Sequence, residues 1–204
     1  MEQARRRASA PAGPTTADLL EGARTNTGYA STAANDKDLV EALQKLNFKE
    51  QAFGKDYYGL LPTLATVAAA YRARGDLLGA RSSLERSAQI AAGCYGLRHE
   101  ATAAAYNNLG EAFHALGEHE DAAAAFAYAL RIATEARRGR PLRASEDSKA
   151  FARIMTPLRN LALHLFSRGD VYAALPLFRH LLGLHELLHD PRLDPDAPAP
   201  ETTA

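Results

Sequence analysis

The residues whose types and spacing could do chemistry stand near the end of the chain, where His185, Glu186 and His189 form the pattern H-E-x-x-H. On a helix, this spacing puts two imidazoles on one face with a carboxylate between them, as in zinc peptidases, where the carboxylate acts as general base. One hypothesis is therefore a zinc-dependent peptidase acting through HELLH at residues 185–189.

Several features weigh against this hypothesis. Catalytic zinc needs a third protein ligand, and Arg192 and Pro195 stand where the metzincin form of the pattern has Gly and His. Histidines at the end of a helix also suit its negative dipole end. We therefore expect no enzyme, no cofactor and no dedicated metal site, with His185 and His189 as weak candidate metal ligands. The other histidines, including His99, His114 and His164, are predicted to be scattered, without the spacing of metal ligands.

The elements that must position these side chains are helices, and the clearest pair lies at residues 106–130. The apolar positions recur at helical spacing: Tyr106, Leu109, Gly110 and Phe113 in the first helix, and Ala122, Phe126 and Ala129 in the second. Between them, Gly117 can take the left-handed conformation that ends a helix, and Glu118 suits the positive start of the next one. The stretch predicts an antiparallel helix hairpin.

The same register occurs twice more in the chain. An upstream copy has its turn glycine 42 residues earlier (117 − 75), and a downstream copy has it 52 residues later (169 − 117). The matching positions are Leu64, Val67, Ala68, Tyr71, Gly75, Asp76, Ala80 and Leu84 upstream, and Leu158, Leu161, Ala162, Leu165, Gly169, Asp170, Ala174 and Phe178 downstream. Each turn pairs a glycine with an acidic residue, so we predict three copies of one hairpin.

This pattern resembles the tetratricopeptide repeat, which has a large apolar residue followed by Leu-Gly/Ala, Tyr, Gly, Ala, Phe and Ala at fixed offsets. The 42-residue period, NNLG at residues 107–110 and YGLRHE at residues 95–100 are similar to the repeats of kinesin light chains. The resemblance covers residues 38–189. It implies an all-α fold, a short α-solenoid of about three antiparallel helix hairpins. Residues 38–53 are predicted to form a single helix, equivalent to the second helix of a hairpin, that caps the N-terminal end of the solenoid.

The resemblance further implies that the first helices of the hairpins line a concave groove, which binds an extended peptide or a neighbouring helix. The groove candidates are Thr66, Ala69 and Arg72 in repeat one, Asn107, Asn108, Glu111 and His114 in repeat two, and Arg159, Asn160 and Leu163 in repeat three. An asparagine amide both donates and accepts, so it can pair with a peptide backbone. Alternatively, Asn107 and Asn160 bond only within or between helices.

Composition restricts the partners of the chain. With 24 basic and 24 acidic residues, its formal net charge is +0 and its pI about 7.1, so no global field favours nucleic acid or an anionic membrane. No apolar run reaches the roughly 18 residues of a membrane span. The single cysteine, Cys94, fits a reducing compartment. We expect a cytoplasmic protein, with an organelle-associated complex, such as a mitochondrial one, as the alternative because MEQARRRASA could be an import signal.

The domain organisation follows from where helical periodicity begins and ends. We predict a flexible N-terminal arm at residues 1–36, a repeat domain at 37–190 and a disordered, acidic, proline-rich tail at 191–204. A basic insertion at residues 137–153 interrupts the domain. It is either a solvated loop or a contact for phosphate or an acidic partner.

The leading functional hypothesis is a non-catalytic scaffold for protein–protein interaction, an accessory subunit of a hetero-oligomeric assembly. The alternative is an adaptor that captures peptides or cargo transiently. The zinc peptidase is a remote third.

Overall fold

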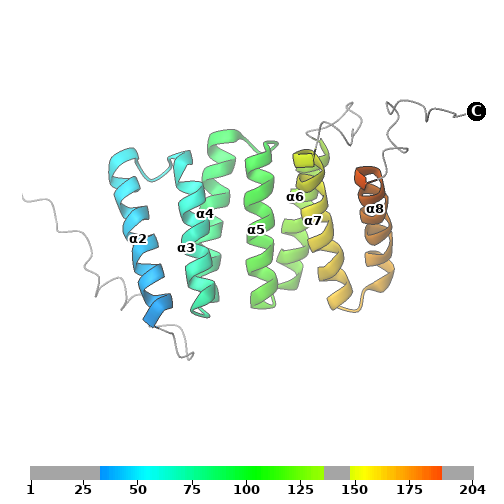
Figure 1. The fold of residues 1–204 in the computed structure, drawn as a ribbon, viewed down its shortest axis with the longest axis horizontal. Coiled ribbons are helices and arrows are strands. Elements are labelled where there is room, and N and C mark those ends of the chain that lie inside the picture. Colours follow the sequence, from blue (N-terminus) through cyan, green and yellow to red (C-terminus); the bar gives the residue numbers. More distant parts are fainter. Residues whose placement is uncertain (1–32, 136–147, 190–204) are drawn as a thin grey trace, which may run out of the picture.

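The fold is an array of helices, seen in a computed structural model that describes residues 33–135 and 148–189 (Figure 1). These residues form seven α-helices, one 3-10 helix and no strand. The elements in chain order are α2 (Ala33–Phe53), η1 (Tyr58–Leu60), α3 (Leu61–Ala73), α4 (Leu77–Tyr95), α5 (Glu100–Leu116), α6 (His119–Glu135), α7 (Ser148–Ser167) and α8 (Val171–His189). The all-α repeat fold predicted from the sequence is confirmed.

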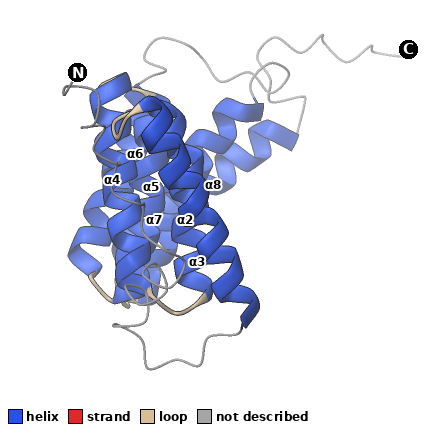
Figure 2. Ribbon diagram, turned by 90° about the vertical axis from the view of Figure 1, so that its left-hand side faces the viewer, coloured by secondary structure: helices blue, strands red, loops and turns tan. Residues whose placement is uncertain are grey.

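Three antiparallel hairpins, α3 with α4, α5 with α6 and α7 with α8, stack along one direction. The second helix of each hairpin packs against the first helix of the next, α4 on α5 and α6 on α7. Figure 1 shows α4 and α6 behind α3, α5 and α7, and Figure 2 shows the same two layers from the side. We call the surface formed by α3, α5 and α7 the A-helix face.

The three hairpin turns are built alike. Gly75, Gly117 and Gly169 have φ values of 78°, 77° and 82°, a conformation that a side chain would strain. Each glycine N–H donates to the carbonyl three residues before it at 2.9 to 3.1 Å, and the next residue's N–H donates five residues back at 2.9 to 3.0 Å. This is the Schellman motif, which satisfies the last carbonyls of a helix. The glycine at each turn therefore has the predicted structural role. At two turns the acidic residue also caps the next helix, because Asp76 accepts from the Gly79 N–H at 2.8 Å and Asp170 from the Ala173 N–H at 3.1 Å.

Helix α2 covers the first hairpin as the predicted cap. Its Leu39, Ala42 and Leu46 pack with Leu64 and Val67 of α3 in one buried cluster. Its C-terminus also matches that of α4, since the glycine that follows each helix donates to the carbonyl four residues back. The helix begins at Ala33, within the segment expected to be an arm.

The end of the basic insertion also differs from the predicted one. Residues 148–153, expected at its end, are the first turns of α7. Phe151 is fully buried there, and Arg153 forms an ion pair with Glu100 of α5 at 2.5 Å. The predictions for residues 1–32, 137–147 and 191–204 concern parts of the chain outside the described residues. None of the described helices has a stretch long and apolar enough to cross a membrane.

Candidate functional site

Four of the predicted groove residues meet on the A-helix face. Asn160 of α7 donates through Nδ2 to Asn107 Oδ1 at 3.1 Å and to Glu111 Oε1 at 3.2 Å, both on α5. Asn107 donates to the same Glu111 oxygen at 3.3 Å, and Arg72 of α3 approaches the other oxygen at 3.5 Å. The network therefore joins one helix from each of the three repeats.

This network decides between the two readings of the asparagines. Asn107 is only 6% exposed, and both N–H groups of the Asn160 amide already donate to α5. A peptide backbone would have to compete with these bonds. The structure thus matches the alternative in which Asn107 and Asn160 bond within and between helices, and the network holds the second and third repeats in register.

The other predicted groove residues do not join this network. Thr66 is exposed and bonds back to Pro62 O in its own helix at 3.0 Å, and Asn108 is half-buried. Leu163 is 49% exposed on α7. Arg159 instead lines a pocket at the α7–α8 pair, and His114 contacts another histidine.

Helix α8 carries an apolar stripe on its surface that was not predicted from the sequence. Val171, Leu175, Phe178 and Leu182 recur at i, i+4, i+7 and i+11, which places them on one face of the helix. Leu175 is 44% exposed and Leu182 58% exposed, whereas Ala174 and Leu184 of the same helix are buried. We call these four residues the α8 outer stripe.

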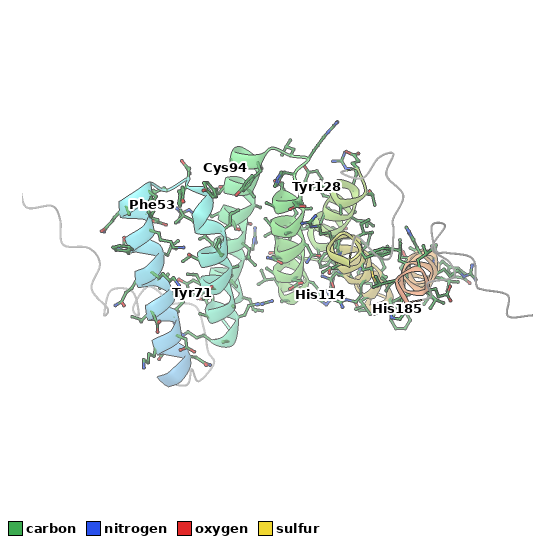
Figure 3. The ribbon with its side chains drawn as sticks, turned by 45° about the horizontal axis from the view of Figure 1, so that its top comes forward. Phe53, Tyr71, Cys94, His114, Tyr128 and His185 are labelled. Atoms are coloured by element: carbon green, nitrogen blue, oxygen red, sulfur yellow. The ribbon has the colours of Figure 1, made fainter. Side chains whose placement is uncertain are left out.

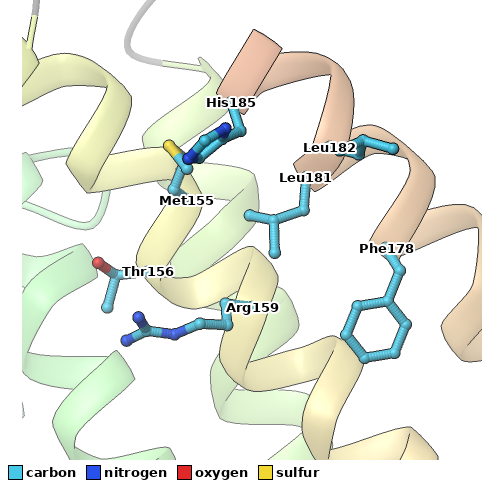
Figure 4. Close-up of a pocket in the computed structure, with 7 residues that line it drawn as sticks. All are labelled: Met155, Thr156, Arg159, Phe178, Leu181, Leu182 and His185. Carbon is cyan, nitrogen blue, oxygen red and sulfur yellow. The ribbon is translucent and has the colours of Figure 1, made fainter. Parts of the chain in front are cut away.

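The stripe adjoins the pocket at the α7–α8 pair (Figure 4). Its lining residues are Met155, Thr156 and Arg159 of α7 and Phe178, Leu181, Leu182 and His185 of α8. Apolar side chains make up most of this wall, and Arg159 and His185 supply polar groups. A partner that covers the stripe could therefore place one side chain in the pocket.

Comparisons with known proteins identify the architecture. Residues 59–135, which include α3 to α6, match the sequence model of the tetratricopeptide repeat family. These residues carry tetratricopeptide repeats. These repeats point generally to protein–protein interaction. No curated protein matches the sequence.

One solved structure has a similar fold, and two others show a weaker likeness. The structure of BtubC (BKLC) from P. vanneervenii is similar with a TM-score of 0.66 at 15% identity over 84% of this chain, and the match spans only 62% of BtubC. Two structures of nearly identical TPR-like repeats named for kinesin light chain, from Podosopora anserina, have TM-scores of 0.48 at 15% identity. They cover 76% and 74% of this chain, and 89% and 87% of their own. At this identity, the likeness to BtubC concerns the fold alone.

In this repeat array, the H-E-x-x-H residues lie on α8, the last described helix. His185 is exposed at the rim of the α7–α8 pocket and lies away from His114 (Figure 3). Among the described residues, neither His185 nor Glu186 belongs to a group of three side chains that could hold a metal ion. The zinc-peptidase hypothesis therefore gains no third ligand from the described residues.

The prediction that the remaining histidines are scattered is wrong. His114 at the end of α5, His119 at the start of α6 and His164 in α7 bring their ring nitrogens within 4.8 Å of one another. Spacing along the chain could not reveal this group, because the turn after α5 and the stacking of the next repeat bring the rings together. Burial lowers the pKa of His164 below its ordinary value, the hydrogen bond to the backbone oxygen of His119 opposes this shift, and the Arg168 guanidinium adds to it.

Proposed function

We propose that this protein is a non-catalytic interaction scaffold, an accessory subunit of a larger assembly, in which the α8 outer stripe binds a helix of a neighbouring protein. Exposed apolar patches of this kind mark sites where proteins bind one another. The A-helix face, with its network of Arg72, Asn107, Glu111 and Asn160, is a second surface.

The observation that carries this proposal is the equivalence of the second helices in the three hairpins. Leu84 of α4 and Phe126 of α6 hold the position of Phe178 in α8. Leu84 is 4% exposed and packs with residues of α5, and Phe126 is 2% exposed and packs with Leu161 of α7. Phe178 has the same position, but the described residues place no following helix over it.

Leu182, the next residue of the stripe, is likewise exposed where its counterpart in α6 is packed. Leu130 of α6 corresponds to Leu182 of α8, and Leu130 packs partly buried beside Phe126 and Leu161 while Leu182 is 58% exposed. Burying a large apolar side chain contributes about 1.5 to 3 kcal/mol. A helix seated where the first helix of a further repeat would lie gains this contribution at several positions. The geometry therefore favours a helical partner over an extended peptide.

The alternative function, transient capture of a peptide on the A-helix face, has weaker support. Arg72, Asn107, Glu111 and Asn160 satisfy one another, so a peptide would have to break existing bonds to form new ones. The groups left to contribute lie outside this network, such as the exposed Thr66 and the half-buried Asn108. We therefore rank the stable subunit first and the adaptor second.

The test compares three forms of the full chain, tagged and expressed in the source cells, by native size fractionation at high salt. The wild type is expected to migrate in a particle much larger than the 22.0 kDa chain. The Leu175→Glu/Leu182→Glu variant is expected to leave that particle. The control Asn108→Ala should remain in it.

Thermal melting of the purified variants completes the design. Leu175 and Leu182 are exposed, so their variants should keep the wild-type melting temperature within a few degrees. Migration of the wild type as a free chain would contradict the subunit proposal. Loss of the particle in Asn108→Ala but not in the stripe variant would instead favour peptide capture on the A-helix face.

A further inference from the structure

The histidine group is assembled from three helices and two repeats. Nδ1 of His164 lies 2.9 Å from Nδ1 of His114, and Nε2 of His164 lies 2.9 Å from the backbone oxygen of His119. His164 is only 2% exposed, whereas His114 and His119 lie at the surface. The group thus has a buried ring at its base and two rings open to solvent.

The hydrogen bonds fix the tautomer of the buried ring. A carbonyl oxygen only accepts, so Nε2 of His164 carries the proton and donates to His119 O. In the neutral ring, Nδ1 then holds a lone pair, and this nitrogen lies 2.9 Å from Nδ1 of His114. Metal-binding histidines have this arrangement, with one nitrogen free for the metal and the other donating to a carbonyl or carboxylate.

The fold itself does not require a histidine at this position. The registers of the repeats align His164 with Ala112 of α5 and Ala70 of α3, and both alanines are buried. A small apolar side chain therefore suffices for packing, and burial of an imidazole is unfavourable unless its polar atoms are bonded. Residue 164 therefore differs from its two counterparts by a side chain that can coordinate a metal ion.

We propose that His114, His119 and His164 form a binding site for Zn²⁺ or a similar divalent transition metal, with water as the fourth ligand. Neutral imidazole suits such ions, whereas calcium and magnesium prefer oxygen ligands. The site goes beyond the interaction scaffold proposed above, because it joins the end of α5 and the start of α6 to α7 of the next repeat.

The geometry needs only small changes to hold the ion. Bonds of about 2.0 to 2.1 Å in a tetrahedral zinc site place ligand nitrogens roughly 3.3 Å apart. The His114 and His164 nitrogens at 2.9 Å must separate slightly, and the exposed His119 ring must close from within 4.8 Å. Arg168 is the nearby cation, so the site relies on coordination by neutral rings and not on a negative field.

The test is a titration of Co²⁺, whose visible absorption reports tetrahedral coordination, into the EDTA-treated full chain. We expect the band to saturate at one equivalent and Zn²⁺ to displace it. His164→Ala should abolish the band, and this variant should fold because alanine holds the equivalent positions of the other repeats. His119→Ala, which changes only an exposed ring, should weaken Co²⁺ binding by about tenfold or more.

The matched control is His185→Ala/His189→Ala, which removes the H-E-x-x-H histidines and leaves the proposed ligands intact. It should bind one Co²⁺ as the wild type does, and Zn²⁺ should raise the melting temperature of both. Absence of a visible band in the wild type would overturn the proposal. Loss of the band in the control, or its persistence in both His164→Ala and His119→Ala, would overturn it as well.

Discussion

The ring of Phe126 on α6 lies against the backbone of Gly110 on α5. A Cβ added at Gly110 would stand 2.7 Å from two ring carbons of Phe126, closer than such atoms approach in proteins. Glycine at this position lets the two helices of the repeat pack with a large aromatic residue between them. The pair therefore fixes the geometry of the second hairpin.

We predict that Phe126→Ala costs about 3 to 5 kcal/mol, because it leaves a cavity at a residue that is 2% exposed. A domain has roughly 5 to 15 kcal/mol in total, so most cooperative unfolding should be lost. Thermal and urea melts measure this, with Asn108→Ala as the control, expected within about 0.5 kcal/mol of wild type. An unchanged melt for Phe126→Ala would show that the repeat register is wrong.

Gly110→Ala tests the other partner of this contact. The added methyl group has no room unless the Phe126 ring moves, so we expect a loss of about 1 to 3 kcal/mol despite alanine's better helix propensity. The control is Gly93→Ala in α4, where an added Cβ meets nothing within 4 Å. That variant should be as stable as wild type or slightly more so. Equal stability of the two variants would contradict the close contact.

The hydrogen bond from Asn160 to Asn107 predicts energetic coupling between the second and third repeats. Asn160→Ala should lose about 1 to 3 kcal/mol, because it removes the donor to the oxygen of the buried Asn107. Asn107→Ala should lose about 0.5 to 1.5 kcal/mol, because Asn160 still donates to Glu111. The double variant should lose less than the sum, with a coupling energy above about 0.5 kcal/mol from urea melts. Strict additivity would mean that the amides act independently.

Stability of the metal-free chain should fall as the pH decreases. Burial holds the pKa of folded His164 below its ordinary 6.5, so the unfolded chain takes up the proton first. The contribution of neutral His164 to the free energy of unfolding is complete above pH 6.5. It is lost as the pH falls through the pKa of His164 in the folded chain. Urea melts in EDTA between pH 7.5 and pH 5 measure this slope. His164→Ala should flatten it, and an equally steep slope in that variant would assign the effect to other groups.

Much of the fold could be predicted from the sequence because each hairpin repeats the same local chemistry. A glycine followed by an acidic residue ends one helix and starts the next, and the apolar spacing sets the faces that pack. The start of α2 at Ala33 was missed, since residues 33–36 have little apolar periodicity.

The candidate sites could be predicted only in part. The alignment of the repeats in the sequence was enough to predict that one face carries Arg72, Glu111 and Asn160. Their pairing with one another depends on distances between the repeats, which the sequence does not give. The histidine group joins residues 45 and 50 positions apart along the chain, so no local spacing marks it. One signal was available: His164 aligns with two alanines, an unusual exchange for a small apolar position.

The most direct measurement is site-specific photo-crosslinking in the source cells, with a benzoylphenylalanine in place of Leu182 or, as the matched control, in place of Asn108. If the α8 outer stripe binds a helix of a neighbouring subunit, the probe at residue 182 should give one dominant adduct that co-migrates with the large particle. The probe at residue 108 should give little. A dominant adduct from residue 108 and none from residue 182 would contradict the proposal and assign partner binding to the A-helix face.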